Sequence, residues 1–346
     1  MSDEPYHVAR TFASLDLISH GRAGWNVVTS WSEAEALNFN RDHQLDYATR
    51  YERAGEFVDV VKGLWDSWDA DAFLYDKMSG QFYDERKLHV LHHQGKYFSV
   101  RGPLNVAPAL QRHPVIVQAG ASPDGRELAA ATADVVYCLP DTLEAARAYY
   151  VDVKGRMATY GREPDDPKIL PGLRPTVGLT TAEAHVKFNT LQALLHPLVA
   201  LSTLASTLDL SGSPLDGPGP LDRQGPQELR SISERLRARV CRDQPTIRQL
   251  SQQVAGMGSG CNVIGTAEEI ANVMQAWFEQ GACDGFNITP PYLPGGCVDF
   301  VNRVIPVFQE RGLFRTDYEG TTLREHLGLK PAVSRYARAS GQPTAE

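Results

Sequence analysis

Five short stretches of the sequence are apolar throughout, and helical patterns follow them, which constrains the fold more than any other feature. They lie near Trp25, Val115, Val135, Pro171 and Phe286. A strand that is apolar on both faces must be covered on both faces, and the helices between successive strands supply that cover. The sequence therefore predicts an α/β fold with a parallel sheet. A doubly wound sheet and a barrel both agree with this pattern.

The composition indicates a globular enzyme rather than a disordered or fibrous chain. Of the 346 residues, 42% are hydrophobic and 22% are charged, and the formal net charge is −8. This mildly acidic balance provides no basic surface for nucleic acid or anionic lipid. No window is apolar enough for a membrane span, and the first residues do not resemble a signal peptide. We therefore expect a cytoplasmic protein that binds neither nucleic acid nor membrane.

Cysteines and histidines give no sign of a disulfide framework or a metal site. The five cysteines are scattered and none forms a CxxC pair, so we expect reduced, buried thiols. His89, His92 and His93 invite a metal interpretation, but in an extended segment His92 would face away from the other two. We predict no metal site.

The segment VQAGASPDGRELAA, residues 117–130, is the most informative motif. A buried strand ends at Gln118, Gly120 permits a tight turn, and Ser122 stands where a helix N-cap belongs. Backbone N–H groups at a helix N-terminus, together with a serine hydroxyl, form a natural phosphate site. Any βα loop also needs a glycine and a cap, so this segment alone leaves both interpretations open.

Two other segments place polar side chains where a ligand could bind. Asn26 lies near the carboxyl end of a buried strand, where ligands of α/β folds gather, and its amide could hydrogen-bond a planar heterocycle or merely fix a loop. Tyr47 and Tyr51 lie four residues apart on one face of a helix expected over residues 46–68. Their hydroxyls could bind phosphate or ribityl oxygens, or their rings could pack in the core.

Eight segments together resemble one family. They are EPYHVARTFASLDLISHGRAGWNVVTS, RYERAGEFVDVVKGLW, KYFSVRGPLNV, HPVIVQAGASPDGRELAA, ADVVYC, NVIGTAEEIA, GACDGFNITPPYLPGG and RGLFRTDYEGTTLREHLGL. In this order they are similar to the bacterial-luciferase-like flavin-dependent monooxygenases, in the branch of the nitrilotriacetate and dibenzothiophene-sulfone monooxygenases. The resemblance extends from about Glu4 to Leu329.

The resemblance implies a (β/α)₈ TIM barrel with insertions. Residues 1–329 would form one domain, with insertions at about 71–110 and 209–254 that are candidate lids, and residues 330–346 would be a frayed tail. The EPYHVAR segment resembles the helix that follows the third barrel strand. We therefore expect an incomplete barrel that lacks about the first three βα units, which agrees with the five strands counted above.

The resemblance also implies the activity. Reduced FMN and O₂ would form a C4a-(hydro)peroxyflavin that inserts one oxygen atom into a small organic substrate, and a separate NAD(P)H-dependent flavin reductase would supply the reduced FMN. A homo-oligomer is expected. The residues that correspond to cofactor contacts are Asn26, Tyr47, Tyr51, Ala121 and Ser122, and no catalytic side chain is assigned. Tyr47 replaces a histidine that is usual in the family, and a phenol cannot become a cation near neutral pH.

Two other hypotheses follow from the same residues. One is a catalytically inactive remnant that at most binds flavin or a partner subunit through exposed sheet edges. The other is a different α/β enzyme that uses the phosphate site at Ser122 for another cofactor. The identity of the substrate does not follow from the sequence.

Overall fold

The computed structural model of the protein describes residues 3–30, 32–205, 217, 236–237, 240–257 and 260–337. The chain forms two compact units, each with its own hydrophobic core. Unit 1 comprises Met1–Val136, Arg156–Lys168 and Asp317–Glu346, and unit 2 comprises Tyr137–Gly155 and Ile169–Thr316.

Unit 1 contains the first three parallel strands and the helices next to them. Its elements are α1 (Pro5–Ile18), β1 (Gly24–Val27), α2 (Glu33–Leu37), α3 (Tyr47–Trp65), η1 (Glu85–Lys87), β2 (His93–Gln94), β3 (Ser99–Val100), β4 (Val115–Gln118), α4 (Pro123–Thr132), the start of β5 (Val135–Cys138), η2 (Met157–Tyr160) and α13 (Leu323–His326). β4 lies between β1 and β5: Trp25 is opposite Ile116, and Val117 is opposite Val135. β2 and β3 form a separate antiparallel hairpin.

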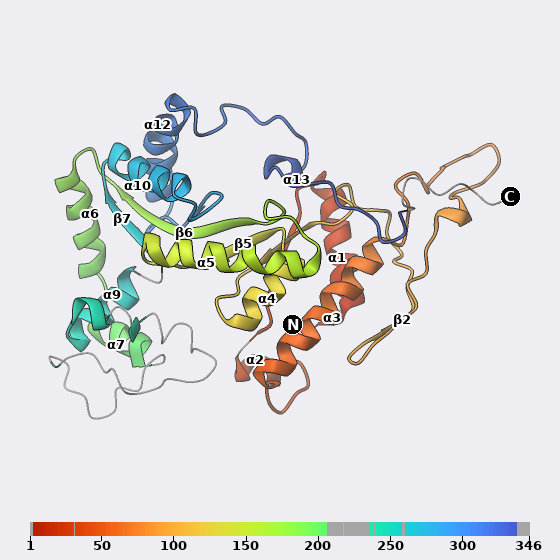
Figure 1. Ribbon diagram of the computed structural model, residues 1–346, viewed down its shortest axis with the longest axis horizontal. Coiled ribbons are helices and arrows are strands. Elements are labelled where there is room, and N and C mark those ends of the chain that lie inside the picture. The colour runs from red at the N-terminus through yellow and green to blue at the C-terminus, as the bar shows by residue number, and fades with distance from the viewer. Residues whose placement is uncertain are drawn as a thin grey trace. The chain divides into compact units, whose positions relative to one another are not determined.

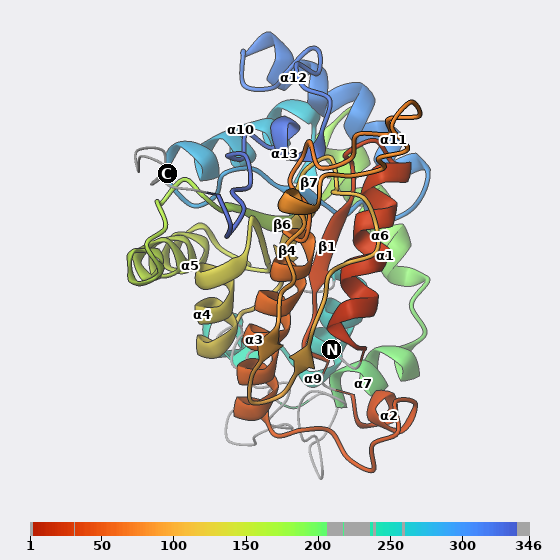
Figure 2. The same ribbon diagram turned by 90° about the vertical axis from the view of Figure 1, so that its right-hand side faces the viewer.

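The core of unit 1 lies between this sheet and the helices α1 and α3. Trp25 and Val27 on β1 and Ile116 on β4 pack against Phe57 and Leu64 of α3. Figures 1 and 2 both show α1 and α3 side by side. Because side chains alternate along a strand, Asn26 points to the opposite face of β1 and is exposed. The sheet therefore has one face closed by helices and one face on which Asn26 stands open.

Unit 2 contains three further parallel strands. Its elements are α5 (Leu143–Arg156, whose last residue belongs to unit 1), β6 (Lys168–Val177), α6 (Thr181–Ala193), α7 (Pro197–Ala205), α9 (Ile247–Met257), β7 (Cys261–Gly265), α10 (Ala267–Glu279), β8 (Asn287–Ile288), α11 (Gly295–Asp299), a π-helical turn (Phe300–Val304) and α12 (Ile305–Glu310). β6 starts in unit 1 and pairs with both β7 and β8: Leu173 is opposite Cys261 on one side and Ile288 on the other. Leu173 also packs against Ile270 of α10.

The α/β class with parallel strands is confirmed, and all five predicted strands exist. The count of five was wrong, because the described residues contain a sixth parallel strand, β7. β7 is short, carries the polar Asn262 and follows the glycine-rich segment 256–260, so it resembled a loop that leads into α10. The count therefore no longer supports the absence of about three βα units, which stays a prediction.

Several other expectations have mixed outcomes. The insertion at 71–110 contains the β2–β3 hairpin, whereas most of the insertion at 209–254 and the end of the tail at 330–346 lie outside the described residues. The single domain over residues 1–329 stays a prediction. Among the helices of the described ranges, none combines the length and hydropathy needed to cross a bilayer.

The expectation of buried thiols holds for three cysteines and fails for two. All five are free, Cys138, Cys261 and Cys283 are buried, and Cys241 and Cys297 are exposed. Burial raises the pKa of Cys261 to about 11 and that of Cys283 to about 12, so both thiols stay protonated at neutral pH. The sequence alone could not separate these from the two exposed thiols, because exposure depends on how each strand, helix or turn packs against its neighbours.

A buried carboxylate joins the amino ends of the strands in unit 1. Asp16, fully buried at the end of α1, accepts hydrogen bonds from Ala23 N, Gln111 N and Gln111 Nε2 at 3.3, 3.0 and 2.6 Å. The other side of the Gln111 amide accepts a hydrogen bond from Arg324 N at 2.9 Å. Through Asp16 and Gln111, this network connects α1 with α13 and with the segments that lead into β1 and β4.

We predict that Asp16→Ala destabilises the protein by roughly 2–4 kcal/mol, because it leaves several buried donors without an acceptor. The measurement is the shift of the denaturation midpoint in urea relative to the wild type. Asp42→Ala, the same change at an exposed position, is the control and should shift the midpoint little. Equal shifts for the two variants would contradict the role assigned to Asp16.

Candidate functional site

The amino end of α4 is built as a helix N-terminus open to a ligand. Ser122 is the N-cap, and its Oγ accepts a hydrogen bond from Gly125 N at 3.2 Å. Pro123 occupies the first helical position, where its missing N–H costs nothing. The partial positive charge of the helix N-terminus therefore lies beside the Ser122 hydroxyl, as the motif predicted.

Two glycines bring the loop and the first turn of α4 into direct backbone contact. A Cβ atom on Gly120 would lie 2.6 Å from the carbonyl of Gly125. A Cβ atom on Gly125 would lie 2.8 Å from Gly120 Cα, 3.0 Å from Ser122 Oγ and 3.1 Å from Tyr51 Oη. The two backbone separations are too short for a Cβ atom at either position. The absence of both Cβ atoms thus lets the loop touch the first turn of α4, next to the Ser122 and Tyr51 hydroxyls.

The two phenols of α3 meet the α4 N-terminus, as the helical spacing allowed. The rings of Tyr47 and Tyr51 lie 4.9 Å apart between centroids, and Ser122 Oγ lies 3.5 Å from Tyr51 Oη. Tyr47 Oη is buried and has no hydrogen-bond partner among the described residues. Burial raises the pKa of Tyr47 to about 12, and the nearby Ser122 and Tyr51 hydroxyls also influence this pKa. The Tyr47 phenol is therefore protonated at neutral pH and can donate a hydrogen bond.

An unpartnered donor is expensive to bury, so its presence is informative. Besides Tyr47 Oη, the Nε2 atom of Gln118 lacks a partner in the described ranges, four residues before Ser122 and on a side chain that is 3% exposed. A phosphate with several acceptor oxygens fits a site of hydroxyl and backbone N–H donors. Asp124, in the first turn of α4, acts against this fit, since its charge lies close enough to raise the pKa of Tyr47.

The remaining predicted residues lie on either side of this site. Ala121, half-buried, precedes Ser122, and its carbonyl accepts a hydrogen bond from Arg126 Nε at 3.0 Å. Asn26 is exposed on β1 opposite Val117, and in the part of the chain that the structure describes no hydrogen bond joins it to the three hydroxyls. The structure thus brings together Tyr47, Tyr51, Ala121 and Ser122 and leaves Asn26 apart on the open face of β1.

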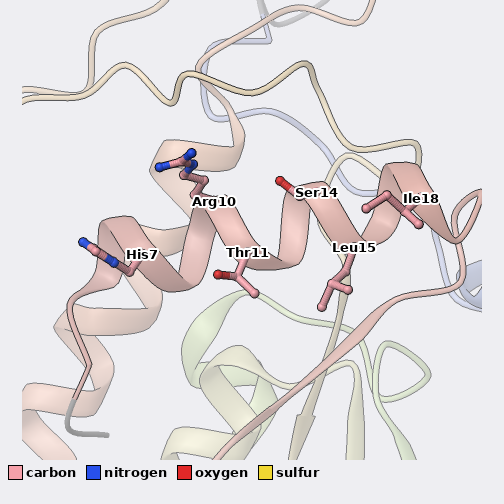
Figure 3. Close-up of a pocket in the computed structure, with 6 residues that line it drawn as sticks. All are labelled: His7, Arg10, Thr11, Ser14, Leu15 and Ile18. Atoms are coloured by element: carbon pink, nitrogen blue, oxygen red, sulfur yellow. The ribbon is translucent and has the colours of Figure 1, made fainter.

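The described residues of unit 1 form a surface hollow at the candidate site and another away from it. One runs between α3 and α4 and is lined by Tyr51, Asp124 and Leu128 among others, so it reaches the candidate site. The other lies along the outer face of α1, and the close-up in Figure 3 shows that its lining, from His7 to Ile18, comes from this helix alone. No predicted site residue lines the second hollow.

The sequence interpretation missed three residues of this region: Gly125, Gln118 and Arg50. Gly125 lies in the first turn of the expected helix, where the sequence gives it no special role, and Gln118 was the last residue of the expected strand. Arg50 is 7% exposed, and the available signal was its place between Tyr47 and Tyr51, on the helix face that the two tyrosines share.

The histidines singled out in the sequence have carboxylate partners. His89 Nε2 lies 3.1 Å from Asp69 Oδ1, and His93 Nε2 lies 3.0 Å from Glu56 Oε1. Within the described ranges no group of three or more His, Cys, Asp or Glu residues is placed to hold a metal ion. The two pairs attach the excursion after α3 to neighbouring segments.

Comparison with known proteins gives the class to which this fold and site belong. The family profile described as luciferase-like monooxygenase matches residues 2–284. The chain is 50% identical to N-acetyl-S-(2-succino)cysteine monooxygenase of Bacillus subtilis (strain 168), over 97% of this chain and 77% of the relative. It is 48% identical to nitrilotriacetate monooxygenase component A of Aminobacter aminovorans (98% and 75%) and 42% identical to dibenzothiophene-sulfone monooxygenase of Rhodococcus erythropolis (98% and 75%).

Solved structures agree. The crystal structure of a long-chain alkane monooxygenase matches with a TM-score of 0.82 at 33% identity, over 94% of this chain and 71% of that one. The structure of riboflavin lyase with modified FMN and riboflavin matches with a TM-score of 0.82 at 29% identity (95% and 73%). The chain is thus a member of an oxidoreductase class with an α/β fold. It belongs to the luciferase-like monooxygenase family, as the resemblance predicted.

We predict that Gly125→Ala destabilises the protein by roughly 1–3 kcal/mol, because the new methyl group meets the Gly120 backbone. Thermal unfolding of the two proteins measures the change. Gly155→Ala is the matched control, since a Cβ atom on Gly155 meets nothing within 4 Å and alanine favours the surrounding α5 helix. The control should be neutral or more stable than the wild type. A neutral Gly125→Ala would refute the close contact.

Proposed function

We propose that the protein is an FMN-dependent monooxygenase that uses reduced FMN and O₂ to insert one oxygen atom into a small organic substrate. The observation that carries the proposal is the cluster of the Ser122, Tyr51 and Tyr47 hydroxyls at the amino end of α4. A member of this family needs a site for the flavin phosphate, and this cluster has the donors and the helix N-terminus that such a site requires.

In this proposal the residues of the chain bind and orient the cofactor. Ser122 Oγ, Tyr51 Oη and Tyr47 Oη would donate to phosphate oxygens, together with backbone N–H groups at Ala121 and Ser122. Asn26, on the open face of β1, would hydrogen-bond the edge of the flavin ring. Reduced flavin, when bound, would supply two electrons, so that one atom of O₂ enters the substrate and the other leaves as water. No side chain is assigned to the chemical step.

The comparisons support this proposal in three ways. The matching riboflavin lyase structure holds a modified FMN. One relative is named component A, which favours a separate flavin reductase as the partner that supplies reduced FMN from NAD(P)H. The relatives are named for chemically varied small organic substrates, which agrees with a small-molecule substrate here. We also propose a homo-oligomer and the incomplete barrel described above.

Neither of the two alternative hypotheses gains support from the comparisons. An inactive remnant would bind flavin without oxygen transfer, and an unrelated α/β enzyme would not prefer flavin. A turnover assay with FMN, NADH, a flavin reductase and a panel of candidate substrates separates them. Substrate-dependent formation of an oxygenated product supports the monooxygenase. If the protein binds flavin but only releases hydrogen peroxide, with no oxygenated product from any substrate of the panel, the result would favour the remnant.

We predict that Ser122→Ala weakens the binding of reduced FMN by about 10-fold or more, since a hydrogen bond to a charged group contributes about 1.5–3 kcal/mol. The measurement is an anaerobic titration followed by flavin fluorescence. Ser14→Ala, on α1, is the control and should bind like the wild type. Unchanged affinity in Ser122→Ala would show that the α4 N-terminus does not hold the phosphate.

Tyr47→Phe should separate binding from stability. Because Tyr47 Oη is buried without a partner, its removal should leave the free protein as stable as before, or more so. The same change should weaken the binding of reduced FMN several-fold, because the donor to the phosphate is lost. Thermal unfolding without ligand and the same titration provide the two readings, with Tyr336→Phe as the control. A less stable variant with normal FMN binding would assign Tyr47 to the core instead.

A further inference from the structure

Arg50 is a buried cation without a carboxylate partner. Its side chain is 7% exposed, and in the described part of the chain no carboxylate lies within ion-pair distance of its guanidinium. A cation removed from water is costly unless other groups replace its hydration. Arg50 therefore stays buried because of the particular groups that surround it.

Two contacts surround the guanidinium, and they come from different elements. Arg50 Nη1 donates a hydrogen bond to the carbonyl of Ser30, and the guanidinium carbon lies 5.6 Å from the centroid of the Tyr47 ring. The first contact reaches the loop after β1, and the second is a cation–π contact with a phenol of the candidate site. Arg50 thus joins the loop that follows Asn26 to the ring of Tyr47.

The residue that accepts this hydrogen bond has an unusual backbone conformation. Ser30 has φ of +58°, in the left-handed region, where a residue other than glycine must be held in place by its surroundings. Ser30 Oγ donates to Glu35 Oε1 at 2.6 Å, so Glu35 of α2 restrains the same residue from the other side. Ser30 lies three residues after the last residue of β1 and four after Asn26, and its conformation sets the course of the chain away from this strand.

We propose that Arg50 is a positioning residue for the flavin: it fixes the backbone at Ser30, and thereby the end of β1 that carries Asn26, relative to the Tyr47 ring. This inference rests on the proposed function. Arg50 would affect how the flavin ring binds, whereas the hydroxyl cluster at the amino end of α4 would bind the phosphate. A lysine ammonium could donate one hydrogen bond or approach the Tyr47 ring, but it is a compact charge and cannot copy the reach of the guanidinium to both, so lysine should replace Arg50 only in part.

The test compares Arg50→Gln with the wild type and with Ser122→Ala in titrations with reduced FMN and with reduced riboflavin. Riboflavin lacks the phosphate. We expect Arg50→Gln to weaken both ligands by the same factor, about 5-fold or more, whereas Ser122→Ala should weaken FMN alone. Arg10→Gln, the same change on the exposed face of α1, is the control and should alter neither affinity. Arg50→Lys should recover part of the lost affinity.

Amide hydrogen exchange provides a reading that does not depend on any ligand. Exchange in peptides that contain Ser30 should accelerate in Arg50→Gln, while exchange in α1 should stay as in the wild type. Unchanged exchange at Ser30 would overturn the proposal even if affinity falls. A loss of affinity confined to FMN would also overturn it, because Arg50 would then act on the phosphate. If wild-type protein binds neither flavin but the exchange at Ser30 responds, the proposed function fails while the structural link between Arg50 and Ser30 stands.

Discussion

The candidate site depends on a backbone contact between two glycines. Gly120 and Gly125 approach so closely that neither could carry a Cβ atom. This contact turns the chain sharply from β4 into α4, and it places the Ser122 hydroxyl over the first turn of the helix. Tyr51 Oη lies beside the same contact. A larger residue at either position would move the helix N-terminus away from the phenols, and the donors would no longer converge.

The way the site is built explains why its donors are neutral. A helix N-terminus provides partial positive charge without a titratable group, and hydroxyls add donors that stay protonated at neutral pH. Burial raises the pKa of Tyr47 to about 12, which keeps its phenol a donor. The Arg50 guanidinium lies against the backbone of the loop after β1 and the Tyr47 ring. The first turns of α3 thus carry both the phenols of the hydroxyl cluster and the arginine that contacts the loop after β1.

Similarity to relatives identifies the family of this chain, whereas its own side-chain packing shows which polar groups lack a partner. Identities of 42–50% over nearly the whole chain place the protein among the luciferase-like monooxygenases. They do not say which donors in this chain are already satisfied. The unpartnered Tyr47 Oη and Gln118 Nε2 atoms are properties of this chain's own packing.

The sequence by itself determined features that arise within a few residues. Apolar runs predicted the parallel strands, Ser122 was identified as a helix cap, and the four-residue spacing placed Tyr47 and Tyr51 on one helix face. It missed β7, whose polar residue and glycine-rich approach conceal a strand that exists only because β6 pairs with it. The meeting of Ser122 with Tyr51, 71 residues apart, and of Arg50 with Ser30, 20 residues apart, was decided by tertiary structure alone. The physical reason is that backbone periodicity and capping act over one or two turns, whereas contacts between distant segments depend on how helices pack against the sheet.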